Sequence, residues 1–213
     1  TYYDLGCGKG TNTYLGFLTV EQSTTDWVKS LVLTAGYEST GDMVVYEKPY
    51  IWNGADACAD NIYQVNASGT YTLQLNADAY ANTQAAVITV DVRNVDVTAP
   101  VIKAHSLEPA SDWTKDGVMV TITETADLQP DGSEGCGLHD TPYSYDDGVT
   151  WTAESSYCYM ENGTHSILVR DRLENVSSYE VSFQNIDYTP PTVESIEYDH
   201  TKNIPSTEIV ITA

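Results

Sequence analysis

The sequence predicts an all-β chain made of tandem β-sandwich modules. Three observations support this fold class. Short segments alternate apolar and polar residues, turns rich in Gly, Asn and Asp separate them, and several motifs recur about 90 residues later. No segment combines the 3.6-residue apolar period of a helix with capping residues. A chain of 213 residues would hold two such modules with segments to spare.

The alternation is clearest in three pairs of segments, with one member of each pair in each half of the chain. Apolar residues at every second position lie on one face of a strand and point to a core. The paired segments are Leu31, Leu33 and Ala35 with Val118, Val120 and Ile122; Tyr71, Leu73 and Leu75 with His165, Ile167 and Val169; and Ile88, Val90 and Val92 with Tyr179, Val181 and Phe183. We therefore expect His165 to pack in a core.

Ordered motifs define an internal repeat. Each motif of the first half has a counterpart in the second, and the spacing drifts by only a few residues, as loop insertions would produce. The pairs are Asp26-Trp27 with Asp112-Trp113, Pro49-Tyr50 with Pro142-Tyr143, Gly69-Thr70-Tyr71 with Gly163-Thr164-His165, and the runs from Asn94 to Pro100 and from Asn185 to Pro191. A unit of about 90 residues suits a seven-stranded immunoglobulin-like sandwich.

The repeat divides the chain into four parts. Residues 1–16 form an N-terminal segment or the end of a preceding module, residues 17–98 the first module, residues 99–189 the second, and residues 190–213 a truncated third. Val193 to Tyr198 and Glu208 to Thr212 are the strands expected in the third. Pro100, Pro190 and Pro191 fix the backbone between modules and favour stiff, extended connections.

Trp27 and Trp113 hold the same place in the two copies, just before the first interior strand. Each indole either covers one end of a core or is exposed for stacking on a sugar. Recurrence at one structural position favours the core role.

The charge excludes two classes of partner. Nine Lys and Arg stand against 31 Asp and Glu, a formal net charge of −22. Such a surface repels the phosphates of nucleic acids and of anionic lipids, so we expect neither partner. No apolar run has the length of a membrane span, and we expect no membrane insertion. The absence of a signal peptide or sorting tail indicates a fragment of a longer protein.

Four cysteines favour disulfides over a metal site, because no close Cys pair occurs among them. The module boundaries favour the pairs Cys136–Cys158 and Cys7–Cys58. The alternative is four reduced thiols in a cytosolic protein. The acidic composition, rich in Thr and Tyr, favours oxidised cysteines and an extracellular location.

Calcium is a weaker expectation. The stretch from Asp127 to Asp140 is an acidic, glycine-rich loop that also contains Asp131 and Glu134, and Asp96 and Asp187 stand at the module junctions. Carboxylate oxygens are the ligands that Ca²⁺ prefers. However, the spacing of an EF-hand loop is absent, and ordinary turn-forming Asp residues give the same pattern. Calcium is therefore not favoured from the sequence, and no cofactor is expected.

No catalytic motif is present. The four histidines are scattered, and the sequence contains no GxSxG, HExxH, Walker or Rossmann pattern. We therefore expect a protein without enzymatic activity.

The second copy resembles a known family. The residues that carry the resemblance are Ser111-Asp112-Trp113-Thr114, Gly137-Leu138, the run from Pro142 to Gly148, Thr150-Trp151, Glu161 to Thr164, Val169-Arg170-Asp171, Ile186-Asp187 and Thr189-Pro190-Pro191. They are similar to bacterial immunoglobulin-like repeats of large surface proteins of Gram-positive gut commensals. The first copy matches more loosely, with Cys58 and Ala59 in place of the aromatic hairpin.

The resemblance implies a secreted or wall-attached protein that is a spacer, an adhesin or a binder of host proteins. Some similar surface proteins bind antibody variable domains in the manner of a superantigen, so immunoglobulin is the partner that the resemblance implies. The alternatives are a structural stalk and, more remotely, a carbohydrate-binding module of a larger enzyme. Tyr2, Tyr3, Tyr14 and the region from Trp52 to Cys58 differ between the copies and are candidates for a binding surface.

Overall fold

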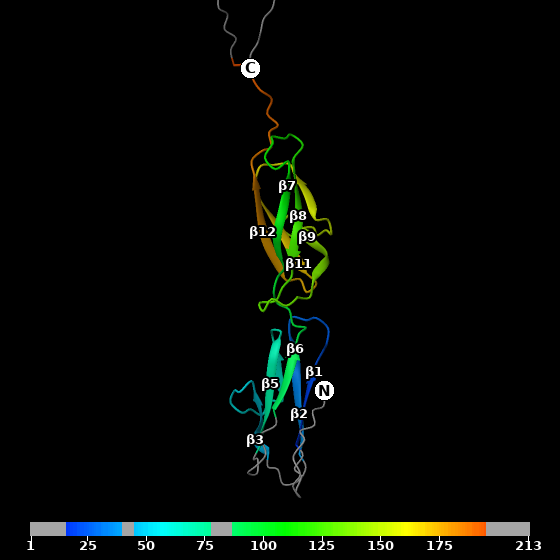
Figure 1. Cartoon of the computed structure of the whole chain (residues 1–213), viewed down its shortest axis with the longest axis vertical. Coiled ribbons are helices and arrows are strands. Elements are labelled where there is room, and N and C mark those ends of the chain that lie inside the picture. Colours follow the sequence, from blue (N-terminus) through cyan, green and yellow to red (C-terminus); the bar gives the residue numbers. More distant parts are fainter. Residues whose placement is uncertain (1–15, 40–44, 78–86, 195–213) are drawn as a thin grey trace, which may run out of the picture.

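The computed structural model of the chain describes residues 16–39, 45–77 and 87–194, and these residues form twelve strands. Six strands precede the proline-containing junction at residues 96–100 and six follow it (Figure 1). The first six are β1 (Gly16–Gln22), β2 (Leu31–Ser39), β3 (Val45–Trp52), β4 (Ile62–Val65), β5 (Gly69–Ala77) and β6 (Val87–Val92). The second six are β7 (Val101–Glu108), β8 (Val118–Ala126), β9 (Leu138–Ser144), β10 (Ser156–Tyr159), β11 (Gly163–Asp171) and β12 (Val176–Phe183).

The same pairing order occurs in both halves, and every pairing between strands is antiparallel. The first half, called module 1 below, has the sheets β1-β2-β4 and β3-β5-β6. The second half, module 2, has the sheets β10-β8-β7 and β12-β11-β9. In each module the first, second and fourth strands thus form one sheet, and the third, fifth and sixth form the other. The chain is all-β in the described ranges, as the sequence predicts.

Each module has its own hydrophobic core, built where the inner faces of its two sheets meet. The alternating residues singled out in the sequence supply most of it. Leu31, Leu33 and Ala35 are buried in module 1, as Val118, Val120 and Ile122 are in module 2. Leu73 and Ile167 hold matching places on β5 and β11, and both are fully buried. The period-two pattern therefore predicted the inward faces correctly.

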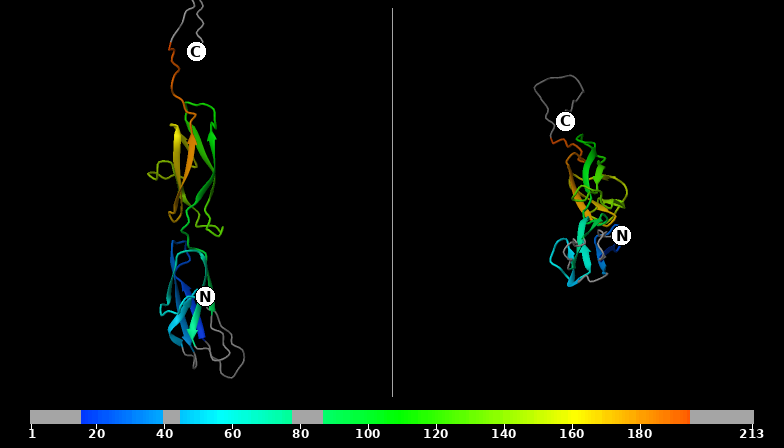
Figure 2. Two further views of the ribbon diagram at one scale, coloured as in Figure 1. Left: turned by 90° about the vertical axis from the view of Figure 1, so that its left-hand side faces the viewer. Right: turned by 60° about the horizontal axis from the view of Figure 1, so that its bottom comes forward.

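The two modules lie end to end along the long axis of the molecule (Figures 1 and 2). The connection is the extended segment between Val95 and Val101, which contains Pro100. Within the described ranges the chain contains no helix with the length and hydrophobicity that crossing a membrane requires.

Candidate cation site at the junction between the modules

The last residues of module 1 are held tightly where the chain leaves it. Val95 is fully buried and pairs in parallel with Val28, outside the regular strands. The backbone N–H of Asp96 donates to Val28 O (2.9 Å), and Asp96 Oδ1 accepts from the N–H of Thr98 (2.9 Å). This turn, closed by its own Asp side chain, fixes the position of the Asp96 carboxylate at the end of the module.

Two further carboxylates come from strand ends of module 2. Asp127 directly follows β8, whose last residue, Ala126, pairs with Val101 at the start of β7. Asp171 is the last residue of β11 and pairs with Leu138 at the start of β9. Because β8 and β11 both end at the edge of module 2 that faces module 1, their terminal carboxylates meet Asp96 there.

These groups form a compact cluster, called the junction cluster below: Asp96, Asp127, Cys136 and Asp171. One ligand atom of each, a carboxylate oxygen or Cys136 Sγ, lies within 4.8 Å of all the others. Asp96 and Asp171 are fully buried, and only 3% of Cys136 is exposed. The cluster thus combines groups from both modules in a site largely closed to water.

Backbone N–H groups hold the carboxylates of the junction cluster in place. Asp96 Oδ2 accepts from the N–H of Cys136 (2.7 Å), which joins module 1 to module 2. Asp127 Oδ2 accepts from the N–H of Gly137 (2.7 Å). Asp171 accepts on Oδ1 from the N–H of Asn175 (2.8 Å) and on Oδ2 from Asn175 Nδ2 (2.7 Å). The same Asn175 amide also donates to Asp96 O (3.3 Å).

One oxygen of the junction cluster has no partner. Asp127 Oδ1 is buried and makes no hydrogen bond. Among the described residues no Lys or Arg forms an ion pair with Asp96, Asp127 or Asp171. Buried charges are normally paired or bound to a metal, so the missing positive charge is the main feature of this site.

Gly135 leaves room for the carboxylates of Asp96 and Asp127 to lie close together. A Cβ atom on Gly135 would lie 2.6 Å from Asp96 Oδ2 and 2.7 Å from Asp127 Oδ2. Both distances are shorter than any normal contact, so a larger residue at this position would push the two oxygens apart.

Burial and mutual repulsion change the protonation of the cluster. Burial raises the pKa of Asp127 above its usual value, the hydrogen bond from Gly137 partly opposes this, and the negative charges of Asp96 and Asp171 raise it further. Burial, as the largest cause, raises the pKa of the Cys136 thiol to about 12. The thiol is therefore protonated at neutral pH, and it donates to Gly137 O, with Sγ 3.7 Å from that oxygen. Three carboxylates and no nucleophile–base pair suit the binding of a hard cation.

The structure changes the interpretation of the acidic stretch from Asp127 to Asp140. It is not an irregular loop throughout, because part of it is paired. Leu128 pairs with Glu134 in an antiparallel bridge, and Gly135 N donates to Asp127 O (3.0 Å). The stretch folds back as a short hairpin, and this places Cys136 and Gly137 against the carboxylates. Of its acids, only Asp127 belongs to the junction cluster.

The expected disulfide Cys136–Cys158 is not formed, and both residues are free thiols. Cys158 lies opposite Met119 near the start of β8, whereas Cys136 lies by Asp127 beyond its end. The length of that strand separates them by roughly 25 Å, and a disulfide needs Cα atoms within about 7 Å. Cys58 is likewise a free thiol, and Cys7, its expected partner, lies outside the described residues.

The two repeated tryptophans do not share the predicted core role. Trp113 is 72% exposed, so that prediction was wrong for the second copy, while Trp27 is half-buried. The parallel bridge between Thr114 and Ile186, not the indole, closes this end of module 2. His165, in contrast, is half-buried and stacks on Tyr159 and Phe183 with ring centroids at 4.0 and 5.0 Å, so it packs at the margin of the core that its inward position predicted.

The residues expected to form a binding surface lie in the N-terminal half of the chain. Tyr2, Tyr3 and Tyr14 lie outside the described residues. Trp52 is buried and stacks on Tyr63 (5.3 Å), and its indole N–H donates to Asp60 O (3.3 Å). The region from Trp52 to Cys58 therefore contributes its largest side chain to the core rather than to the surface.

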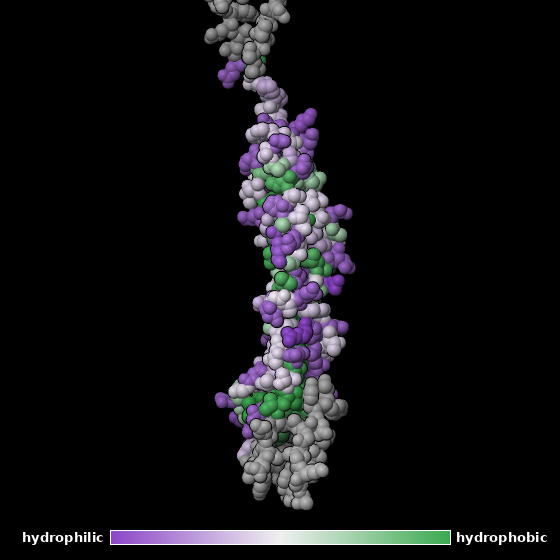
Figure 3. Space-filling model, in the orientation of Figure 1, coloured by the Kyte–Doolittle hydropathy of each residue, from purple (hydrophilic) through white to green (hydrophobic). Residues whose placement is uncertain are grey.

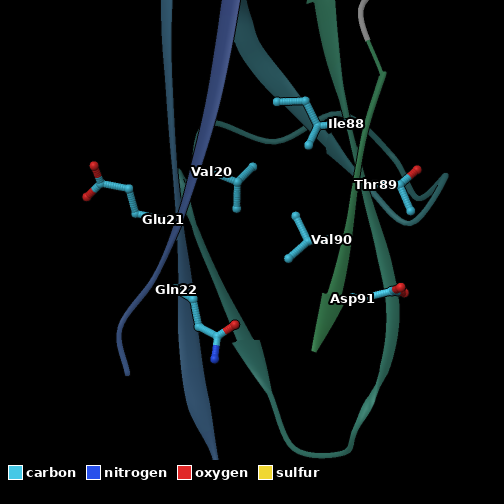
Figure 4. Close-up of a pocket in the computed structure, with 7 residues that line it drawn as sticks. All are labelled: Val20, Glu21, Gln22, Ile88, Thr89, Val90 and Asp91. Atoms are coloured by element: carbon cyan, nitrogen blue, oxygen red, sulfur yellow. The ribbon is translucent and has the colours of Figure 1, made fainter. Parts of the chain in front are cut away.

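A pocket lies between β1 and β6, the edge strands of opposite sheets in module 1 (Figure 4). Val20 and Val90 point into the space between the two strands, while Glu21, Thr89 and Asp91 point away from it. The described residues that line it include no histidine, cysteine or lysine. The pocket therefore lacks a nucleophile–base pair and adds no chemistry to that of the junction.

Asp187 repeats the turn of Asp96 at the far end of module 2. Its N–H donates to Thr114 O (2.9 Å), and its Oδ1 accepts from the N–H of Thr189 (2.8 Å). Asp187 is exposed. Two strands were expected in a third module. Glu208 to Thr212 lies outside the described residues. Of Val193 to Tyr198, only residues 193–194 are described, and they are not in a strand.

Comparison of the chain with protein-family models, with curated proteins and with solved structures finds no match.

Proposed function

We propose that the chain is a non-catalytic segment of an extracellular rod, in which immunoglobulin-like modules are joined end to end as a spacer. Each module joins its first, second and fourth strands in one sheet and its third, fifth and sixth in the other. This is the order of a constant-type immunoglobulin sandwich, sheets ABE and CFG, without strand D. The proposal of an extracellular location rests on the acidic, tyrosine-rich composition and on the family resemblance.

The observation that carries the spacer proposal is the buried side chain of Asp96. It belongs to module 1, yet its Oδ2 accepts from the N–H of Cys136 in module 2, and its own carbonyl accepts from Asn175 Nδ2. A linker with fully solvated polar groups would allow the modules to swing freely. Here the linker is hydrogen-bonded to both modules, which favours one fixed angle between them. The surface in Figure 3 fits a spacer, since hydrophilic side chains predominate between small hydrophobic patches on the face shown.

Small-angle X-ray scattering of the full chain tests the spacer proposal. We expect the profile of an extended rod with one dominant angle between the modules. Asp96→Ala should broaden the distribution of angles, because it removes the carboxylate that reaches Cys136. Asp187→Ala is the matched control, since it breaks the same turn at the other end of module 2, and it should leave the angle unchanged. A broad distribution already present in the unmodified chain would contradict the proposal.

Binding of a host protein, with immunoglobulin as the first candidate, is the second proposed function. Three exposed apolar residues at the far end of module 2 favour it: Trp113 (72% exposed), Tyr188 (54%) and Met160 (50%). Tyr188 Oη donates to Met160 O (2.8 Å), so two of the three are in contact. Exposed Trp and Tyr residues often dominate the energy of an interface.

Surface plasmon resonance with immobilised human immunoglobulin tests this second function. Specific binding that Trp113→Ala weakens about tenfold or more would support it, since truncating a central aromatic residue commonly costs 2 kcal/mol or more. Val149→Ala, at an 80% exposed apolar residue elsewhere on module 2, is the control. Absence of binding, or equal loss in both variants, would leave the spacer as the function.

A further inference from the structure

The junction cluster holds three carboxylates close together, and no basic side chain of the described residues neutralises their negative charge. Asp96 and Asp171 are fully buried, and Asp127 lies against both. No basic side chain of the described residues pairs with any of them. Burial of like charges this close together is strongly unfavourable unless a counter-charge accompanies them. Hydrogen bonds from backbone N–H groups compensate part of this cost, but they supply no net charge.

The unpaired oxygen Asp127 Oδ1 is a second, independent indication of a ligand. Every other carboxylate oxygen named above in the cluster accepts at least one hydrogen bond, whereas this oxygen is buried and accepts none. A buried, unpaired acceptor is costly and rare in native proteins. Binding a cation would satisfy this oxygen and neutralise the charge of the cluster in one step.

The ligand types of the cluster and its burial favour Ca²⁺ among the common cations. Two oxygens on opposite sides of Ca²⁺ are about 4.6–5.2 Å apart, given Ca–O distances of 2.3–2.6 Å. The ligand atoms here all lie within 4.8 Å of one another, close enough for one Ca²⁺ to contact them together. Mg²⁺ usually keeps several waters in a regular octahedron, which suits a site with Asp96 and Asp171 fully buried less well. Zn²⁺ prefers Cys and His ligands, whereas three of the four ligand residues here are aspartates and none is a histidine.

We propose that Asp96, Asp127 and Asp171 together bind one Ca²⁺ at the junction, with one carboxylate from module 1 and two from module 2. Gly135 provides the space in which the oxygens of Asp96 and Asp127 approach each other. Because the ligands come from both modules, the cation is bound fully only when the modules are docked, and binding in turn favours the docked arrangement. This inference is independent of the spacer function, since a binding protein could use the same calcium-stabilised junction.

Isothermal titration of the full chain with CaCl₂, after removal of divalent ions with a chelator, tests the proposal. We expect one site. Asp127→Asn should weaken binding about tenfold or more, because the number of charged ligands sets the affinity of a calcium site. The amide oxygen of Asn can still accept from Gly137, so this variant should fold. Asp187→Asn, in the equivalent turn at the other end of module 2, and Asp131→Asn, at the tip of the hairpin, are matched controls and should bind as the unmodified chain does.

A second variant and a thermal measurement complete the test. Gly135→Ala should weaken Ca²⁺ binding without removing any ligand, because its Cβ would displace the oxygens of Asp96 and Asp127. Ca²⁺ should raise the melting temperature of the unmodified chain and of both controls, but not that of Asp127→Asn. In the chelator, Asp127→Asn should melt no lower than the unmodified chain, which would show that the variant is folded.

Three results would overturn the proposal. The first is no heat and no thermal shift at about 10 mM Ca²⁺, above the ~0.1–1 mM dissociation constants typical of extracellular modules. The second is an equal loss of binding in Asp187→Asn or Asp131→Asn, which would place the ion elsewhere. The third is binding of Zn²⁺ but not Ca²⁺ that disappears in Cys136→Ser, which would make the site a thiolate site.

Discussion

At the scale of single residues, the hydrogen-bond donors around a carboxylate set its pKa and its contribution to stability. Asp146 closes the turn between β9 and the bridge at Thr152 by accepting three hydrogen bonds. Its Oδ1 accepts from Ser144 Oγ (2.9 Å) and from the N–H of Thr150 (2.8 Å), and its Oδ2 accepts from Thr150 Oγ1 (2.6 Å). The Thr150 hydroxyl, then the Thr150 N–H, lower the pKa of Asp146 below its usual value.

This lowered pKa predicts how stability depends on pH. The ionised form is favoured in the folded state, so the contribution of Asp146 is fully present above the pKa of the unfolded chain, 3.8. It is lost as the pH falls through the lower pKa of the folded state. Asp146→Asn should therefore melt below the unmodified chain at pH 6, and the difference should shrink below about pH 4.

Thermal melts between about pH 3 and pH 7 would measure this difference. Asp147→Asn is the control, because the neighbouring carboxylate accepts none of these hydrogen bonds. A difference for Asp146→Asn that stays constant across this range would contradict the assignment.

The opposite environment surrounds Asp127. Burial and two neighbouring carboxylates raise its pKa instead of lowering it. Two aspartates of module 2 thus have opposite electrostatic roles. One is hydrogen-bonded in a solvated turn and stabilises the module by itself, whereas the other is placed where a cation is needed to complete the site.

At the scale of strands, the sequence was most informative where the pattern is local. Alternation of Val118, Val120 and Ile122 identified the inward face of β8 because the side chains of a strand alternate between its two faces. The repeat likewise aligned Leu73 with Ile167, and both are buried. These features depend only on neighbouring positions along the chain and on the two-residue period.

Long-range features were harder to predict. The sequence singled out Asp96 at a module junction and Asp127 in an acidic loop, but did not connect them with each other or with Asp171. The signal was present, because Asp127 follows one strand and Asp171 ends another, and both strands end at the edge that faces module 1. Recognising it requires the strand directions, which the amphipathic pattern alone does not provide.

Two errors have the same origin. The prediction for Trp113 assumed that a repeated position keeps its burial, yet the loop that contains Trp113 leaves the indole outside. The pairing Cys136–Cys158 was inferred from membership of one module, without knowledge of which end each cysteine occupies. Sequence repeats show that two segments are equivalent, but they do not show what covers each residue in space.

At the scale of the whole molecule, two cores are joined by one junction. The described core residues of module 1 and module 2 form separate clusters, with no member in common. Hydrogen bonds at Asp96 connect the two modules, as does the exposed ion pair between Arg93 and Asp131. Stability should therefore be the sum of two nearly independent domains, with coupling mainly through the junction cluster, because an exposed ion pair contributes little.

Matched substitutions in the two cores test this independence. Leu73 on β5 and Ile167 on β11 are both fully buried at equivalent positions. Replacing either by Ala should cost about 2–5 kcal/mol, from lost burial and the cavity that remains. In a chelator, where the junction cluster carries uncompensated charge, Leu73→Ala should lower only the calorimetric transition of module 1, and Ile167→Ala only that of module 2.

Calcium should change this behaviour if the cation connects the modules. Unfolding of either module removes at least one carboxylate from the site, so the free energy of Ca²⁺ binding is lost whichever module unfolds first. With Ca²⁺ present, the transition of the unsubstituted module should then also shift in each variant, and the two transitions should move closer together. Two transitions that remain as far apart with Ca²⁺ as without it would show that the cation does not couple the modules. A single transition in the chelator, lowered equally by both substitutions, would show that hydrogen bonds around Asp96 are sufficient to make the two modules unfold as one.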